Sequence, residues 1–215
     1  LAAVDPDIPV ISEEDLDSQH LTRPDHYFLI DPIDGTASYS GGFPGYVTQI
    51  AYMENAVPRL AAIYAPAFDQ IFLAEKDGGA ILNGERLELT PRTGDRTLID
   101  NYPEPRGTAV QAMCDLSATG YVECGGISLK ICRIADGTAQ MFYKDVVVRD
   151  WDVGAPALVL REAGGVFTEL DGSDFSYDGS YEKPGLIAAS NLDLANEIQT
   201  WIDRRMNAEP QRVGM

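Results

Sequence analysis

The stretch LIDPIDGT, residues 29–36, contains two aspartates whose spacing suits metal chemistry. Asp31 and Asp34 flank Pro32, which fixes its own φ and holds the backbone extended before the next turn. A strand end that turns sharply can direct both carboxylates and the intervening Ile33 carbonyl at one point. Hard divalent cations such as Mg²⁺ bind oxygen clusters of this kind. The simpler alternative is an Asx-turn at a strand end, without a ligand.

The end of the same motif suits an anion. If Gly35 and Thr36 begin a helical turn, their amide groups have no partner within that turn and are available to an adjacent phosphate. A cation held by carboxylates beside such amides would form a site for a phosphate ester.

Two further acidic clusters stand at the edges of predicted elements. Glu13 and Glu14 lie in SEED, residues 12–15, after the short apolar stretch IPVI, and Asp152 lies in RDWDVGAP, residues 149–156. Taken alone, SEED is typical of a solvated loop, and Asp152 is a reasonable helix N-cap. Together with the first motif, the three acidic sites predict a pocket that contains several carboxylates.

The charge of the chain limits its partners. In 215 residues, 16 Lys and Arg stand against 34 Asp and Glu, which gives a net charge of −18 without any basic run. This balance argues against a nucleic-acid polymer or an anionic membrane as partner. A small phosphorylated metabolite would need a cation as mediator.

Hydropathy and cysteine content suggest a cytoplasmic protein. No apolar run approaches the roughly 20 residues of a membrane span, and the sequence does not open with a signal-peptide pattern. The three cysteines, Cys114, Cys124 and Cys132, lack C-x-x-C spacing, so we expect buried free thiols in a reducing compartment.

Residues 26–90 predict a largely antiparallel sheet. HYFLID, residues 26–31, is an apolar and aromatic strand that ends at Pro32, and YVTQIAYME and RLAAIYAP flank NAVP as a hairpin. The DGG and NG turns in QIFLAEKDGGAILNGERLEL continue the pattern. The aspartates of the first motif therefore belong at a strand end.

The second half predicts alternating helices and strands. SLKICRIADG is a helix with Ser128 as N-cap and Gly137 past its end, and PALVLREAGG is a helix with Pro156 in its first turn and Gly164 as its stop. AQMFY, GVFTEL and LIAAS are strands, and NLDLANEIQTWIDRRM closes the chain as an amphipathic helix.

The change of pattern around TPRTGDR, residues 90–96, predicts a seam between two subdomains. Residues 1–95 would form an α+β part, mainly antiparallel sheet, that carries the metal motif. Residues 96–215 would form an α/β part. The fold class as a whole is α/β.

DPIDGT followed by WDVGAP, with SEE upstream of both, resembles the inositol monophosphatase superfamily of Mg²⁺-dependent, lithium-sensitive phosphomonoesterases. GGAILNGERL, the YAP before it, ADGTAQMFY and REAGGVFTELDG also resemble this family, so the resemblance covers nearly the whole chain. It implies the layered αβαβα fold of the sugar phosphatases.

The resemblance implies a set of metal ligands. Glu13, Asp31 and the Ile33 carbonyl would hold one Mg²⁺, and Asp34 and Asp152 would join the bridging Asp31 at a second. Two or three ions per site are expected.

The resemblance also implies catalytic roles. Thr36 with Glu13 would orient the attacking water, Asp34 would hold the metal beside it, and the Gly35 and Thr36 amides would receive the phosphate. Glu14 ranks behind its neighbour. One ion would lower the pKa of a water and the other would stabilise the leaving oxygen, so no phosphoenzyme is required.

Two signals point to different substrates. VISEED, IYAP and ISLK are similar to the 3'(2'),5'-bisphosphate nucleotidases, in which Ser128 and Lys130 would suit a second phosphate. Asp145 falls where inositol and sugar phosphatases place an acidic residue that binds hydroxyls. The alternatives are a helix-surface lysine and a solvated loop carboxylate. We favour the nucleotidase, with an inositol-1-phosphate or sugar phosphate phosphatase as the alternative.

The resemblance departs at its start, because family members carry a longer segment before the SEE position that helps to hold a third metal. We therefore expect this chain to bind Mg²⁺ but to turn over poorly unless another segment completes the site. A catalytically weak regulatory member of the fold is the alternative from another class. GGFPGYV, residues 41–47, would line the substrate pocket or a homodimer interface.

Overall fold

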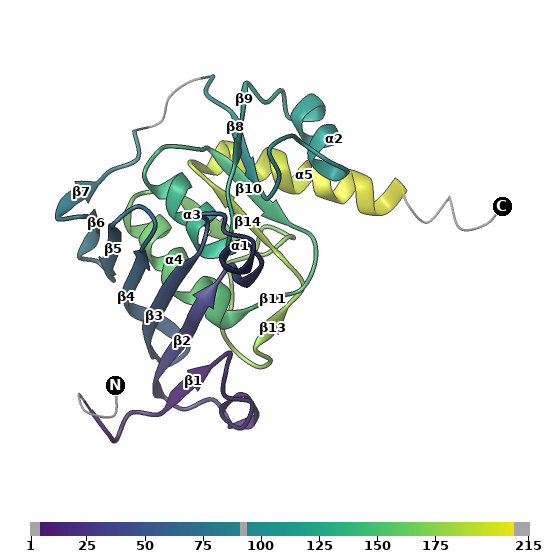
Figure 1. Cartoon of the computed structure of the whole chain (residues 1–215). Coiled ribbons are helices and arrows are strands. Elements are labelled where there is room, and N and C mark those ends of the chain that lie inside the picture. Colours follow the sequence, from purple (N-terminus) through teal and green to yellow (C-terminus); the bar gives the residue numbers. More distant parts are fainter. Residues whose placement is uncertain (1–4, 91–93, 209–215) are drawn as a thin grey trace.

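The computed structural model describes residues 5–90 and 94–208, which form two large sheets with helices between and beside them (Figure 1). The first sheet has seven strands in chain order: β1 (Val10–Ser12), β2 (His26–Asp34), β3 (Val47–Glu54), β4 (Val57–Ala65), β5 (Gln70–Glu75), β6 (Gly79–Leu82) and β7 (Glu85–Leu87). Only β1 and β2 pair in parallel within this sheet, and the other neighbours are antiparallel. The antiparallel sheet predicted over residues 26–90 is confirmed.

The second sheet has five strands in the order β12-β14-β10-β8-β9. Their bounds are β8 (Thr97–Asp100), β9 (Gly120–Glu123), β10 (Met141–Lys144), β12 (Val166–Thr168) and β14 (Leu186–Ala189), and a separate pair is formed by β11 (Val148–Arg149) and β13 (Glu182–Lys183). The helices are α1 (Thr36–Ser40), α2 (Thr108–Asp115), α3 (Ile127–Ala135), α4 (Asp150–Glu162) and α5 (Leu192–Ala208), with a short 3₁₀ turn at Ser18–His20.

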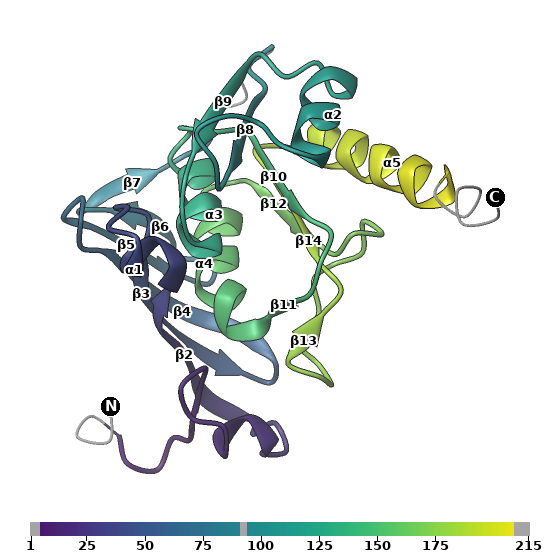
Figure 2. The same ribbon diagram turned by 45° about the vertical axis from the view of Figure 1, so that its right-hand side comes forward.

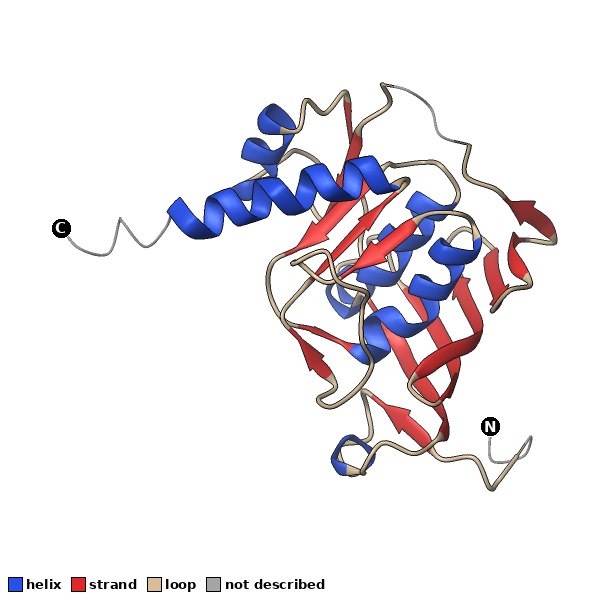
Figure 3. Ribbon diagram, turned by 180° about the vertical axis from the view of Figure 1, so that it is seen from behind, coloured by secondary structure: helices blue, strands red, loops and turns tan. Residues whose placement is uncertain are grey.

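Helices α3 and α4 lie between the two sheets, and α2 and α5 lie on the far side of the second sheet (Figure 2). Seen from behind, α5 crosses the second sheet along its outer face (Figure 3). The layers of the described residues thus run sheet, helices, sheet, helices, and the α/β class predicted from the sequence is confirmed. None of these helices has the length and apolar character of a membrane span.

The alternation of side chains in the first sheet explains its packing on α4. In β3, Val47, Ala51 and Met53 share one buried face, as expected for a strand with one side against the core. The helix approaches this face at Gly154, where a Cβ would lie 2.8 Å from Leu29 Cδ2. A side chain at that position would force the Leu29 side chain to shift.

The opposite face of the first sheet is apolar but exposed. Leu60, Tyr64 and Ile71 show 49%, 41% and 39% of their surface, respectively, on the side of β4 and β5 that points away from α4.

The helices of the second half begin earlier than the sequence predicted. Helix α3 has Gly126 as its N-cap and starts at Ile127, so Ser128 lies inside its first turn rather than capping it. Helix α4 starts at Asp150, and Pro156 therefore stands in its interior rather than in its first turn. The prediction treated proline as a helix start, but a donor from outside α4 makes an internal proline tolerable, as described below.

The predicted seam falls partly outside the described residues, because residues 91–93 are among those not described. One large core contains side chains from both halves, including Leu29 and Leu158. The division into residues 1–95 and 96–215 stays a prediction.

The cysteines are all free, but they do not share one environment. Cys124 and Cys132 are buried, whereas Cys114 is exposed on the outer side of α2, so the expectation of three buried thiols is wrong at Cys114. The pattern of residues in α2 buries Ala109 and Ala112 instead.

Candidate active site

Strand β2 carries both aspartates of the first motif. The strand continues through Pro32 to Asp34, and its register against β3 shifts between Asp31 and Asp34. The prediction ended the strand at Pro32, but this irregularity accommodates the proline, and the Thr48 hydroxyl donates to the Pro32 carbonyl at 2.7 Å. Asp31 Oδ1 accepts a hydrogen bond from the Ile33 amide at 2.9 Å, so the Asx-turn and the acidic cluster occur together.

The turn after the aspartates leads into α1. Gly35 adopts a left-handed conformation with φ of 86°, and α1 begins at Thr36. A side chain at Gly35 would be strained and would place its Cβ 2.8 Å from the Gly45 carbonyl oxygen. The predicted binding of phosphate by the Gly35 and Thr36 amides stays a prediction.

A crossing of glycines brings α3 onto the aspartate motif. The Gly126 amide donates to the Gly45 carbonyl at 2.6 Å, and a Cβ on Gly125 would lie only 1.9 Å from that same oxygen. As a result, the Ile127 and Ser128 amides donate to the two Asp34 carboxylate oxygens at 3.3 and 2.8 Å. Sequence reasoning missed this crossing, although the glycines of GGFPG and CGG were its signal.

The other two acidic clusters reach the same place. Glu13 follows β1, and its amide donates to the Ile30 carbonyl at 3.2 Å. Asp152 lies in the first turn of α4, where its Oδ2 accepts a hydrogen bond from the Arg149 amide at 2.9 Å. The N-cap of α4 is Arg149, so the interpretation of Asp152 as the helix N-cap is wrong, because the helix begins two residues before it. Asp152 lies in the first turn and lines the same cavity as the other carboxylates. Glu14 is exposed.

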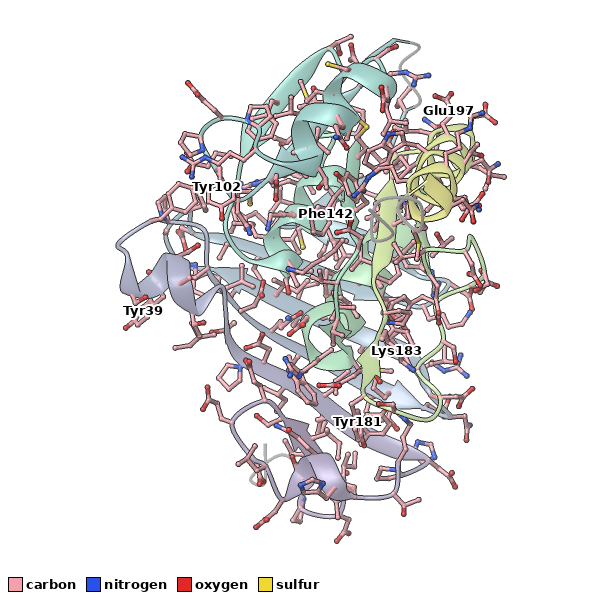
Figure 4. All side chains as sticks on the ribbon, turned by 90° about the vertical axis from the view of Figure 1, so that its right-hand side faces the viewer. Tyr39, Tyr102, Phe142, Tyr181, Lys183 and Glu197 are labelled. Carbon is pink, nitrogen blue, oxygen red and sulfur yellow. The ribbon has the colours of Figure 1, made fainter. Side chains whose placement is uncertain are left out.

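One cavity of about 490 Å³ gathers most of the predicted site. Its lining includes the following predicted residues: Glu13, Asp31, Ile33, Asp34, Gly35, Thr36, Lys130 and Asp152. Phe43 from the GGFPGYV stretch lines it as well, together with Asn101, Tyr102 and Lys144, which were not predicted. Figure 4 shows Tyr102 and Tyr39 along the same edge of the molecule. The fold brings these predicted residues to one cavity. Their metal-binding, catalytic and phosphate-binding roles stay predictions.

Burial and mutual repulsion make these carboxylates unusual acids. Burial, and then the nearby Asp34 and Glu13, raise the pKa of Asp31 to about 9. Burial, followed by Asp34 and Glu13, raises the pKa of Asp152 to about 7, against the effect of the Arg149 amide. Burial also raises the pKa of Asp34. A bound cation would favour the ionised carboxylates and so oppose these shifts.

The donor set fits a hard divalent cation. It consists of carboxylate oxygens with one main-chain carbonyl nearby, and carbonyl and carboxylate oxygens are what Mg²⁺ prefers. Among the described residues, no three Asp, Glu, His or Cys side chains already stand as a complete metal site. Asp34 and Asp152 instead accept main-chain hydrogen bonds, which leave a second lone pair on each oxygen for a cation.

These shifts predict an inverted pH dependence of stability without metal. Between pH of about 4 and about 9, the unfolded chain has lost the Asp31 proton that the folded chain retains, so the free energy of unfolding should fall as pH rises. Saturating Mg²⁺ should reverse the trend, because it binds the deprotonated cluster. Urea unfolding at several pH values, with EDTA and with Mg²⁺, measures both. A free energy of unfolding that rises over this range in EDTA would contradict the burial of these acids.

The structure gives Lys130 a different environment from a helix-surface lysine. Its side chain is only 1% exposed, and its ammonium group donates to the Gly125 carbonyl at 2.6 Å and to Asn101 Oδ1. The Phe142 ring centroid lies 5.1 Å from Nζ, and Figure 4 shows Phe142 within the second sheet. Burial lowers the pKa of Lys130 to about 8. The surface alternative is therefore wrong, and a substrate role stays a prediction.

Asp145 and Ser128 do not line the main cavity. Asp145 lines a smaller neighbouring cavity of about 160 Å³ and pairs with Arg205 of α5 at 3.2 Å, so it is not a free loop carboxylate. Ser128 is fully buried, and its hydroxyl donates to the Asp152 carbonyl at 2.9 Å. Their predicted contacts with substrate stay predictions.

An ion pair that the sequence did not reveal stands beside the site. Arg23 precedes β2 and reaches Asp150, the first residue of α4, with 2.6 Å between Nη2 and Oδ2. It also donates to the Tyr27 hydroxyl at 2.5 Å and stacks on the Tyr181 ring, 4.2 Å from its centroid. Figure 4 shows Tyr181 close to Lys183 in this region. The pair fixes the start of α4, and hence Asp152, against the first sheet.

Comparison with known proteins agrees with this architecture. A model of the inositol monophosphatase family matches residues 1–207. A Neisseria meningitidis protein named putative Nus factor SuhB is 29% identical over 202 residues, covering 88% of this chain and 74% of its own length. A Thermotoga maritima protein named fructose-1,6-bisphosphatase/inositol-1-monophosphatase is 27% identical over 199 residues, covering 90% of this chain and 75% of its own.

Solved structures show the same fold. The extragenic suppressor protein suhB of Bartonella henselae superposes with a TM-score of 0.76 at 27% identity, covering 93% of this chain and 78% of its own. Inositol monophosphatase II of Staphylococcus aureus superposes with a TM-score of 0.80 at 18% identity, covering 98% and 82%, which supports the fold alone.

A layered α/β fold with buried carboxylates around one cavity is that of a metal-dependent phosphatase, which acts on small phosphorylated molecules. The chain belongs to the inositol monophosphatase family and is a phosphoric monoester hydrolase.

Proposed function

We propose that the chain hydrolyses a phosphate monoester that carries a second anionic group, and that a 3'(2'),5'-bisphosphate nucleotide is its substrate. The observation that carries this proposal is that Lys130 and Lys144 line the same cavity as the carboxylates. In a chain with a net charge of −18, two lysines beside an acidic cluster are well placed for an anion that the metal does not already hold.

In this proposal, the carboxylates and one carbonyl hold two or three Mg²⁺ ions. The ligands would be Glu13, Asp31, the Ile33 carbonyl, Asp34 and Asp152. Bound Mg²⁺ would lower the pKa of a water molecule and offset phosphate charge.

The residues around the metal ligands supply orientation. The Thr36 hydroxyl and the Glu13 carboxylate would accept hydrogen bonds from the attacking water and orient it. The Gly35 and Thr36 amides would donate to the phosphate oxygens at the start of α1. Because Phe43 and Tyr102 also line the cavity, the leaving group would lie against aromatic side chains.

A second candidate is hydrolysis of inositol 1-phosphate or a sugar phosphate. Relatives bear the names inositol monophosphatase 1 and inositol-1-monophosphatase, and Asp145 lies one residue from Lys144. Its ion pair with Arg205 would have to open before Asp145 could bind a hydroxyl. A catalytically weak, regulatory role is the alternative from another class, since several relatives are named Nus factors.

We also propose that the protein is cytoplasmic and sensitive to lithium, and that it has no nucleic-acid polymer or membrane as partner. The GGFPGYV stretch would line the substrate pocket or a homodimer interface.

Lys144→Ala tests the substrate proposal. Phosphate release from 3'-phosphoadenosine 5'-phosphate and from inositol 1-phosphate should be compared in the parent, in K144A and in D145N. Loss of a charged hydrogen bond to the second phosphate should raise KM for the bisphosphate about 10-fold or more, with little effect on inositol 1-phosphate. Lys76→Ala, a lysine paired with Asp77 outside the cavity, is the matched control.

The other outcomes separate the candidates. The second candidate would replace the nucleotidase proposal if the parent preferred inositol 1-phosphate and if KM for this substrate rose in D145N but not in K144A. Release from neither substrate in Mg²⁺ would favour the regulatory class.

A further inference from the structure

Helix α4 has an unusual residue in its second turn. Pro156 lies within Asp150–Glu162 and has no amide hydrogen, so the carbonyl four residues earlier loses its helical donor. That carbonyl belongs to Asp152. The proline ring also crowds this carbonyl, which tilts such groups away from the helix axis. The Asp152 carbonyl is part-buried, and a main-chain carbonyl withdrawn from water is stabilised by a new donor.

Ser128 supplies that partner. Its hydroxyl donates to the Asp152 carbonyl at 2.9 Å, and its side chain is fully buried. The same residue uses its amide to hold Asp34 Oδ2 at 2.8 Å. One residue of α3 therefore binds the main chain of Asp152 and the carboxylate of Asp34 simultaneously.

We propose that Ser128 is a positioning residue for the metal site, whose hydroxyl replaces the donor that Pro156 removes and thereby sets Asp152 relative to Asp34. The inference rests on the proposed role of these aspartates as metal ligands. In this role Ser128 acts through the two aspartates, and its burial outside the lining of the cavity suits that role better than the predicted contact with substrate. The role of Ser128 depends on Pro156, because the proline leaves the Asp152 carbonyl free for the serine hydroxyl.

The pairing gives a sharp test in the form of a double-mutant cycle. Mg²⁺ binding without substrate is measured by calorimetry in the parent, S128A, P156A and S128A/P156A. Ser128→Ala should weaken Mg²⁺ binding about 10-fold, as is typical of residues that orient metal ligands. In S128A/P156A the alanine amide at position 156 can donate to the Asp152 carbonyl, so most of the lost affinity should return.

Two controls separate positioning from packing. Ser128→Thr keeps the hydroxyl and should retain more Mg²⁺ affinity than S128A. Ser190→Ala removes another buried serine hydroxyl, one that accepts a hydrogen bond from Asn191 away from the cavity, and should leave Mg²⁺ affinity at the parent value.

The inference is overturned if S128A binds Mg²⁺ as S190A does, or if the double variant binds as weakly as S128A. Should S128A fail to fold, the double variant must still fold, and its failure would equally overturn the inference. Asp152→Asn separates the positioning role of Ser128 from the proposed assignment of the aspartates as metal ligands. Parent-like Mg²⁺ binding by D152N would refute the ligand assignment, whereas loss in D152N with no loss in S128A would refute only the role of Ser128.

Discussion

Asp31→Asn should abolish Mg²⁺ binding and phosphatase activity while leaving the fold intact. The proposed role of Asp31 is to bridge two ions, so the loss should exceed the roughly 10- to 100-fold that residues behind the ligands cost. The Oδ1 atom of asparagine can still accept a hydrogen bond from the Ile33 amide, which preserves the local turn. The variant isolates the charge of the side chain from its shape.

The same variant should be more stable than the parent without metal. Its amide carries no charge, so the repulsion from Asp34 and Glu13 that raises the pKa of Asp31 disappears. The gain should be larger at pH 8 than at pH 5, because the parent loses stability over this range as its unfolded chain releases the Asp31 proton that the folded chain retains, whereas asparagine has no such proton.

Thermal unfolding with and without Mg²⁺ measures both effects. The parent should unfold at a higher temperature in Mg²⁺, and D31N should not respond. Asp25→Asn, an exposed aspartate just before β2, is the matched control and should behave as the parent. An upward shift of D31N in Mg²⁺ equal to that of the parent would show that Asp31 is not a ligand.

Arg23→Ala should lower the free energy of unfolding by about 3–5 kcal/mol, the usual cost of leaving one member of a buried ion pair alone. Asp150 is fully buried, and Arg23 donates to it at 2.6 Å. Burial raises the pKa of Asp150 to about 7 in spite of Arg23 and Lys183. The destabilisation should therefore be greatest above pH of about 7, where the stranded carboxylate cannot remain protonated without cost.

Urea unfolding at pH 8 in EDTA tests this prediction. Arg59→Ala breaks an ion pair with Glu54 in which both side chains are more than 30% exposed, and it should cost less than about 1 kcal/mol. A combined R23A/D150N variant should recover part of the loss. If R23A and R59A lowered the free energy of unfolding equally, the buried Arg23–Asp150 pair would contribute no more to stability than an exposed pair.

Local chemistry explains why much of the site could be predicted. The proposed ligands in DPIDGT are close in sequence, and proline and glycine constrain their backbone, so Asp31 and Asp34 were recognisable as a pair. Helix α5 was similarly predictable because Leu194, Ile198, Trp201 and Ile202 recur with helical spacing.

Features that depend on distant contacts could not be predicted. Pro156 usually marks a helix start, and only the hydroxyl of Ser128, 28 positions earlier, makes it acceptable inside α4. Arg23 and Asp150 are 127 positions apart. Lys144 ends a short strand and has no local signal that would single it out. In each case the tertiary partner, absent from the local sequence, decides the role.

The place of α4 between the two sheets also bears on how the protein folds. Glu13 and Asp152 are separated by most of the chain, and they meet only when this helix has docked on the first sheet. Contacts of such long sequence separation form slowly, because a large loop must close before they contribute. Mg²⁺ would therefore bind the folded state and not an early folding intermediate. Its binding would stabilise the protein only after α4 has docked on the first sheet.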